Sequence, residues 1–212
     1  MNTIDRTIIE SALTYEAYRK VITNLLSQDK TTGLIQSESL LHYTKLNETR
    51  MNRLDKTTIL TADSLEKLAH ITQPQIWLVL TEAWCGDAAQ AIPVMNKLAA
   101  ANPNITLRLL LRDENPAIMD AFLTDGSRSI PKLIALDADT LEVFATWGPR
   151  SKTLQAILLP QLAEIKQIAD PDLRSEKMNE WKTDAQSWYN QDKTRSTQAD
   201  LLEAVMEKVE VD

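Results

Sequence analysis

The sequence is poor in several residue types, and each shortage excludes a class of protein. Its 212 residues include 1 cysteine, so no intramolecular disulfide can form and a disulfide-stapled fold is excluded. The 4 glycines and 8 prolines are too few for a collagen-like or low-complexity chain. Basic residues number 23 against 30 acidic ones, which gives a net charge of −7. We therefore expect no nucleic-acid partner, because phosphate binding needs clustered lysine and arginine.

Long apolar runs are also missing. Charges at Asp5, Arg6 and Glu10 interrupt the first twenty residues, so these do not form the apolar centre of an export signal. No stretch approaches the roughly 18–20 apolar residues of a membrane-spanning helix. We therefore expect a cytoplasmic protein that does not bind membranes.

Metal and phosphate sites of the common kinds have no matching residues. The 2 histidines, His42 and His70, are far apart in the chain, and no second cysteine is present to complete a zinc site. A glycine-rich phosphate loop is also missing. The sequence therefore predicts no bound metal and no resident cofactor.

The middle of the chain, residues 57–168, alternates between strand and helix patterns. Apolar runs of strand length occupy 75–81, 105–111, 132–137 and 141–147, and the helical patterns lie at 86–101, 116–123 and 151–167. The three residues between the last two strands indicate a hairpin. This order predicts an α/β fold, with a mixed sheet that has parallel strands first and an antiparallel hairpin last, and helices on both faces.

Both ends of the chain read as helical extensions. The N-terminal one covers 1–56, with a second helical stretch at 39–54. The C-terminal one covers 169–212. It carries one apolar stripe that includes Trp181 and Trp188, and another formed by Leu202, Val205 and Val209, with Thr197 and Asp200 as a capping pair. Stripes of this kind are typical of core or docking surfaces.

The single cysteine, Cys85, follows the first buried run and begins a helical pattern. A helix N-terminus has free N–H groups and the positive end of the helix dipole, and both favour the thiolate over the thiol. The thiolate is the reactive form of cysteine. A free cysteine is otherwise a small buried hydrophobe, so its position leaves both roles open.

Four landmarks in this region resemble thioredoxins. Trp84-Cys85-Gly86 resembles the start of their W-C-G-P-C turn, and Asp113-Glu114-Asn115-Pro116 resembles their D-x-N-P. Ser129-Ile130-Pro131 resembles the loop that carries their cis-proline, and Gly148 and Ser151-Lys152 also have counterparts. The chain looks like a thioredoxin-like variant that keeps only the first cysteine, W-C-G-D-A-A-Q, and carries helical extensions.

The resemblance assigns roles to particular residues. It implies that Cys85 is the attacking cysteine and that Pro131 is a cis-proline facing it. It also implies a shallow substrate groove, formed by Trp84, Gly86, Ile130, Trp147 and Gly148.

Departures from the thioredoxin pattern put the redox role in doubt. Ala88 replaces the second cysteine, so the chain has no thiol of its own to resolve a mixed disulfide. Val79 replaces the buried aspartate that accepts a proton in thioredoxins, although Glu82 is close in sequence. Asp87, beside Cys85, should raise the thiol pKa, whereas Arg128 near the proline loop would lower it.

Two functions therefore compete. In the first, Cys85 exchanges with a protein disulfide or a glutathionylated protein, and an external thiol such as glutathione releases it. In the second, the chain is a redox-inactive thioredoxin-fold binding or adaptor module for a protein partner, with the helical extensions as docking surface.

Overall fold

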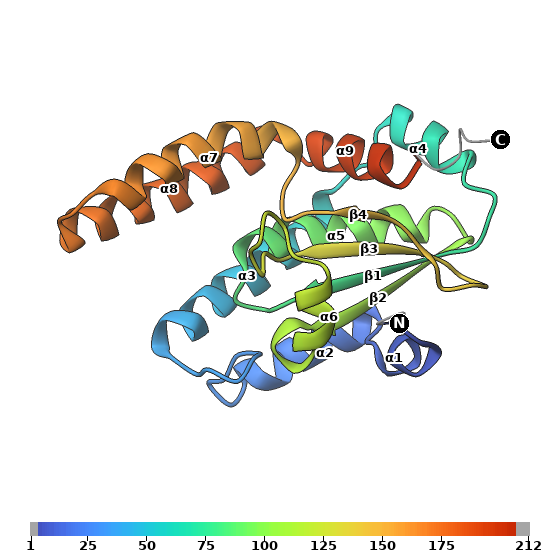
Figure 1. Cartoon of the computed structure of the whole chain (residues 1–212), viewed down its shortest axis with the longest axis horizontal. Coiled ribbons are helices and arrows are strands. Elements are labelled where there is room, and N and C mark those ends of the chain that lie inside the picture. The colour runs from blue at the N-terminus through green and yellow to red at the C-terminus, as the bar shows by residue number, and fades with distance from the viewer. Residues whose placement is uncertain (1–3, 207–212) are drawn as a thin grey trace.

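A mixed sheet forms the centre of the protein. The structure is a computed structural model that describes residues 4–206. The sheet has four strands in the order β2-β1-β3-β4 (Figure 1). They are β1 (Gln75–Thr81), β2 (Ile105–Leu111), β3 (Lys132–Asp137) and β4 (Val143–Trp147). β1 pairs parallel with β2 and antiparallel with β3, and β3 and β4 form an antiparallel hairpin, which confirms the expected fold.

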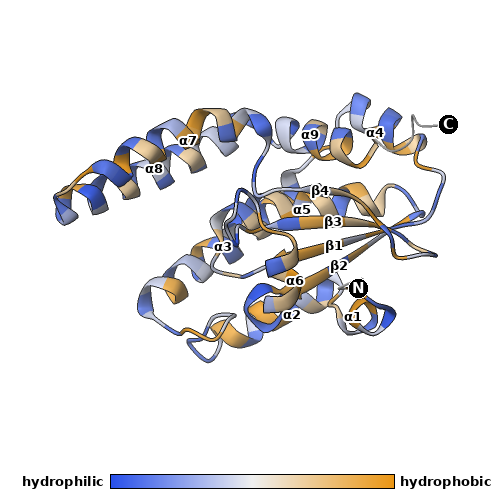
Figure 2. Ribbon diagram, in the orientation of Figure 1, coloured by the Kyte–Doolittle hydropathy of each residue, from blue (hydrophilic) through white to orange (hydrophobic). Residues whose placement is uncertain are grey.

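The buried strand β1 explains why the sheet forms where it does. All seven of its residues are buried, as a continuous apolar run predicts for a strand covered on both faces. Figure 2 shows that the sheet strands are predominantly hydrophobic. The edge strand β4 is more exposed, and only its last residue, Trp147, is buried.

Helices flank the sheet and extend from both ends of the core. They are α1 (Arg6–Ser11), α2 (Tyr15–Leu26), α3 (Glu38–Thr57), α4 (Ala62–Ala69), α5 (Gly86–Ala100), α6 (Pro116–Ala121), α7 (Lys152–Gln167), α8 (Pro171–Asp192) and α9 (Arg195–Met206). Hydroxyl side chains at Ser37, Thr61 and Ser151 cap α3, α4 and α7 by accepting a backbone N–H in the first turn. The helical patterns of the sequence thus become helices with boundaries close to those expected.

The N-terminal extension also contributes a short strand-like contact. Between α1 and α2, Leu13 pairs antiparallel with Leu109 of β2, with N···O distances of 2.8 and 2.9 Å. Because β2 is an edge strand, its outer backbone groups would otherwise lack partners in the sheet. The extended segment at Leu13 thus separates α1 from α2.

The expected cap of the last helix is wrong. α9 begins at Arg195, so Thr197 lies inside the helix and is buried. The carboxylate of Asp192 accepts the Ser196 N–H instead, at 3.0 Å. Asp200 accepts a hydrogen bond from Trp147 Nε1 at 2.7 Å. The tertiary contact with β4 therefore decides the role of Asp200. Val209, expected on the same apolar stripe, lies outside the described residues.

The extensions share the core of the central fold. One cluster of buried apolar side chains joins the sheet to residues from both ends of the chain, among them Tyr18 and Ile22 of α2 and Leu201 and Val205 of α9. The helices α7 and α8 pack on each other through a second cluster, formed by Leu154, Leu158, Ala185 and Tyr189. Figure 1 shows this helix pair projecting past the sheet.

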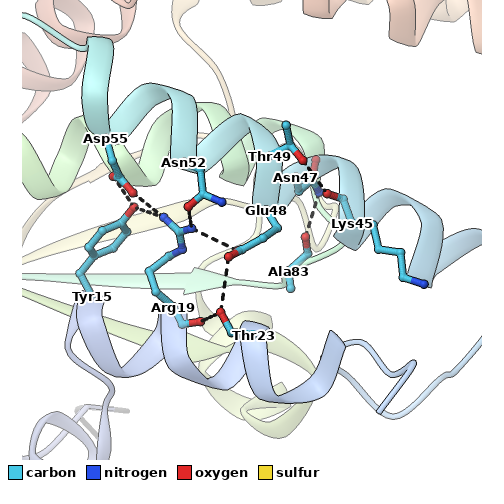
Figure 3. Close-up of polar contacts among 10 residues, drawn as sticks. All are labelled: Tyr15, Arg19, Thr23, Lys45, Asn47, Glu48, Thr49, Asn52, Asp55 and Ala83. Carbon is cyan, nitrogen blue, oxygen red and sulfur yellow. Dashed lines mark hydrogen bonds and ion pairs between the residues drawn. The ribbon is translucent and has the colours of Figure 1, made fainter. Parts of the chain in front are cut away.

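A polar network fastens α2 to α3 (Figure 3). The guanidinium of Arg19 is ion-paired with Asp55 and, at 3.2 Å, with Glu48. Asp55 also accepts a hydrogen bond from the Tyr15 hydroxyl at 2.7 Å. The Arg19 side chain is 14% exposed, so these charges are only partly screened by water. The network therefore holds α2 against α3, the helix that lines the cleft beside Cys85.

Replacing Arg19 with methionine should lower the free energy of unfolding by about 2 kcal/mol. Asp55 then loses a charged hydrogen-bond donor and Glu48 loses its ion-pair partner, at a largely buried site. Urea titration measures this loss. Lys45→Met is the matched control, since Lys45 pairs with Asp29 at an exposed site where an ion pair is worth about 0–1 kcal/mol. Equal losses in the two variants would contradict the role given to the network.

Candidate functional site

Cys85 lies in a turn between the central strand and its following helix. β1 ends at Thr81, α5 begins at Gly86, and Cys85 is the N-cap residue of α5. Its Sγ accepts the backbone N–H of Ala88 at 3.5 Å. The expected position of the thiol at a helix N-terminus is confirmed.

The proline loop faces this thiol. The Ile130–Pro131 peptide bond is cis, as the resemblance implies. The Cys85 thiol donates to the carbonyl oxygen of Ile130, with an Sγ···O distance of 3.2 Å. Cys85 and Pro131 therefore come together as expected, with the thiol hydrogen engaged by the proline loop.

Burial decides the protonation state of Cys85. The residue is 9% exposed, and burial is the main cause that raises the pKa of its thiol from an ordinary value of 9.0 to about 12. The Asp87 carboxylate raises this pKa further, whereas the backbone N–H groups of Ala88 and Asp87 and the charge of Arg150 lower it. The thiol is the favoured form despite the helix N-terminus, because burial destabilises the thiolate by more than the helix dipole and the hydrogen bonds stabilise it.

Arg150, rather than Arg128, is the cation beside the thiol. Arg128 is ion-paired with Asp120 at 2.6 Å, and its side chain is 57% exposed. Arg150 is ion-paired with Asp87 at 2.7 Å, and its side chain is 16% exposed. Sequence reasoning missed Arg150, although it lies two residues after the Gly148 landmark.

Glu82 supports a neighbouring turn. Its side chain is buried, and Oε1 accepts the backbone N–H of Asp113 at 2.9 Å. Burial raises the pKa of this carboxyl. The buried acid thus holds the turn that follows β2, the turn that carries the D-x-N-P landmark.

The expected substrate groove is largely filled. Ile130, Pro131 and Trp147 are buried, and the Trp147 indole is hydrogen-bonded to Asp200 of α9. Gly148 packs closely on the carbonyl oxygen of Pro131. Of the five predicted groove residues, Trp84 and Gly86 are the two that line the cleft beside Cys85.

That cleft lies between α3 and α8, above the Cys85 turn. Its volume is about 780 Å³. α3 contributes side chains that include His42, Tyr43 and Arg50, and α8 contributes Trp181, Lys182 and Gln186. The C-terminal extension therefore covers the Cys85 turn, and Trp181 is part of the cleft wall. None of these residues belongs to a motif of the turn, so sequence reasoning did not single out the cleft.

Polar contacts hold α8 over the turn. The Tyr189 hydroxyl donates to Asp87 at 3.0 Å, and Gln186 accepts from the Gln90 amide at 2.7 Å. On the α3 side, Lys182 donates to the Tyr43 hydroxyl at 3.1 Å. Because Asp87 binds both Tyr189 and Arg150, the residue that replaces the thioredoxin proline anchors the cover of the site.

The described residues form no cluster of metal ligands. Within residues 4–206, no group of three or more histidine, cysteine or acidic side chains is placed to hold a metal ion. No helix in that range is long and apolar enough to cross a membrane.

Comparisons with known proteins agree with this fold. A family model described as thioredoxin matches residues 33–174. No curated protein matches the chain. The crystal structure of PA1234, a protein of unknown function from Pseudomonas aeruginosa, aligns with a TM-score of 0.58 at 14% identity, covering 92% of this chain and 99% of that one. An HIV epitope-scaffold aligns with a TM-score of 0.52 at 14% identity, covering 91% of this chain and 98% of the scaffold.

At such identities the two structures support the fold alone. The family match covers more than half of the chain and includes the Cys85 turn, the proline loop and α3. It begins inside the segment assigned to the N-terminal extension and ends in α8. The chain belongs to the thioredoxin family.

Proposed function

We propose that this protein is a thioredoxin-fold binding module in which Cys85 is a buried part of the site and not a nucleophile. The observation that carries the proposal is the thiol itself, buried beneath α8, hydrogen-bonded to Ile130 and raised in pKa to about 12. With its pKa raised in this way, the thiol keeps its proton at neutral pH. A thiol–disulfide exchange enzyme depends on the thiolate.

The missing redox groups support the same function. Ala88 stands where a resolving cysteine would be. The charge of the Asp87 carboxylate disfavours a thiolate at Cys85. The same carboxylate is ion-paired with Arg150 and hydrogen-bonded to Tyr189, so it holds the walls of the cleft together. A binding module keeps these contacts, whereas an exchange enzyme must expose the sulfur to a second sulfur atom.

Alkylation of Cys85 by iodoacetamide, followed from pH 6 to 10 in the native protein, tests this function. We expect native Cys85 to react at least a hundredfold more slowly than the same cysteine in urea, with no titration near pH 8.5, because burial disfavours the thiolate. The urea-unfolded chain is the control, since it carries the same single thiol. Rapid native alkylation with an apparent pKa below 8.5 would overturn the proposal.

Monothiol exchange is the second candidate, favoured by the position of Cys85 at the start of α5 opposite the cis Ile130–Pro131 bond. In that reaction the thiolate attacks a glutathionylated cysteine, forms a mixed disulfide with glutathione and releases the protein thiol. A second glutathione thiolate then attacks and frees Cys85, leaving oxidised glutathione. A glutathione-coupled assay that is active in the wild type and silent in Cys85→Ser would establish it.

A further inference from the structure

The cleft above Cys85 carries positive charge in an acidic protein. Three cationic side chains line it, Arg50, Arg150 and Lys182, against the single carboxylate of Asp87. The formal charge of the lining is therefore three minus one, or +2, whereas the whole chain carries −7. A local charge opposite to that of the protein indicates a site for an anion.

Arg50 lines the cleft without a salt-bridge partner of its own in the described part of the chain. It forms no ion pair with any described residue, and its Nη1 donates to the neutral amide oxygen of Asn47 at 2.8 Å. Asn47 in turn donates to the carbonyl oxygen of Ala83 at 2.8 Å, which ties Arg50 to the Cys85 turn. The side chain is half-buried, and burial lowers the pKa of its guanidinium. Bound anions offset such a desolvation cost.

The donors of the cleft meet over Gly86. A β-carbon placed on Gly86 would lie 3.7 Å from Arg50 Nη1 and 3.4 Å from the amide nitrogen of Gln186. Lys182 lies across the opening, 4.9 Å above the Tyr43 ring, and forms no ion pair with a described carboxylate. A small group above Gly86 would thus be within reach of a guanidinium, and a larger ligand would extend toward an ammonium.

The remaining walls suit an apolar body. Trp84 and Trp181 are both half-buried lining residues. Arg112 lies 4.9 Å from the centre of the Trp84 ring, and Arg150 lies 5.4 Å from the centre of the Trp181 ring. A volume of about 780 Å³ is much larger than an inorganic anion needs and falls within the range of small-molecule sites.

We propose that this cleft binds a small organic dianion, whose charged group lies at Arg50 and whose apolar body lies against the tryptophans. Phosphate monoesters and dicarboxylates share this chemistry, and the planar guanidinium fork binds either group through paired hydrogen bonds. This inference rests on the proposed function, because it names the ligand class of the same cleft.

Titration of the full chain with phenyl phosphate at pH 8, followed by tryptophan fluorescence and calorimetry, tests the site. We expect saturable binding that Arg50→Gln weakens at least tenfold. Arg53→Gln is the matched control and should bind as the wild type does, because Arg53 is an exposed cation of the same helix that does not line the cleft. Lys182→Gln removes an exposed cation and should also weaken binding. Because this position is exposed, the variant tests the site even if Arg50→Gln does not fold. Phthalate in place of phenyl phosphate distinguishes carboxylate from phosphate ligands.

Three results would overturn the dianion site. The first is no binding of either dianion at 10 mM, which is roughly the weakest affinity of interest. The others are equal binding by the wild type and both cleft variants, and binding of neutral phenol as tight as that of phenyl phosphate. The result is separable from the test of the proposed function. An inert Cys85 with no dianion binding removes the ligand assignment alone, whereas a reactive Cys85 removes the proposed function and leaves the titration as an independent finding.

Discussion

Gly148→Ala is expected to lower the free energy of unfolding by about 4 kcal/mol. The backbone of Gly148 has φ +121°, a conformation that L side chains rarely adopt and that costs of order 1–3 kcal/mol. A β-carbon there would also lie 2.1 Å from the carbonyl oxygen of Pro131, so backbone must move. Because whole domains are stable by only about 5–15 kcal/mol, such a loss is severe. The same shift would disturb the proline loop whose Ile130 carbonyl binds the Cys85 thiol.

Gly126→Ala is the matched control for this prediction. Gly126 also has a positive φ, at 73°, but nothing lies within 4 Å of a β-carbon placed on it. We expect it to cost about 1 kcal/mol, the backbone strain alone. Urea unfolding of the two variants separates strain from the clash. Should Gly148→Ala be no less stable than Gly126→Ala, the close contact with Pro131 would be refuted.

The protein is expected to lose stability steeply above pH 9. Burial raises the pKa of the Cys85 thiol to about 12, and it also raises the pKa values of the buried phenols of Tyr18 and Tyr189. Each of these groups therefore holds its proton longer in the folded state than in the unfolded chain. Their contribution is fully present below the unfolded pKa and is lost as pH rises toward the folded one. For Cys85 this window runs from about pH 9 to 12, at about 1.4 kcal/mol per pH unit.

Unfolding free energies measured between pH 7 and 11 check this prediction. By pH 11 the thiol alone should account for a loss of about 3 kcal/mol. Cys85→Ala removes the titrating thiol, so its stability should decline less between pH 9 and 10, where tyrosines with an ordinary pKa near 10 are only beginning to ionise. Tyr18→Phe serves as the second variant and should flatten the profile above pH 10. If the wild type and Cys85→Ala follow parallel curves, the thiol is not protected by burial.

Much of the fold is readable from local patterns. The apolar runs that become β1, β2 and β3 coincide with those strands. A short apolar run is stable when it is buried, and a strand covered on both faces buries the whole run. Caps such as Ser151 act within one turn of their own helix, so they also need no distant partner. The Cys85 turn and the cis-proline loop were placed opposite each other by their resemblance to thioredoxins.

Which side chains surround Cys85 depends on residues that are far from it in the sequence. Asp87 is two residues from Cys85 in the sequence, but its partners Arg150 and Tyr189 come from the segment between β4 and α7 and from α8. Arg128 is near the proline loop in sequence, yet its ion pair with Asp120 keeps it at the surface. The sequence therefore does not distinguish one arginine from another, and the tertiary packing decides which of them lies beside Cys85.

Short-range patterns and composition are enough to predict the class of fold, the central strand, the single thiol and the turn that presents it. What surrounds that thiol is visible only in the folded protein: α8 covers the turn, Ile130 accepts the thiol hydrogen and Arg50 lines the same cleft from α3. The reason is that desolvation and ion pairing act between groups brought together by long-range packing, and no local pattern records how deeply a side chain is buried.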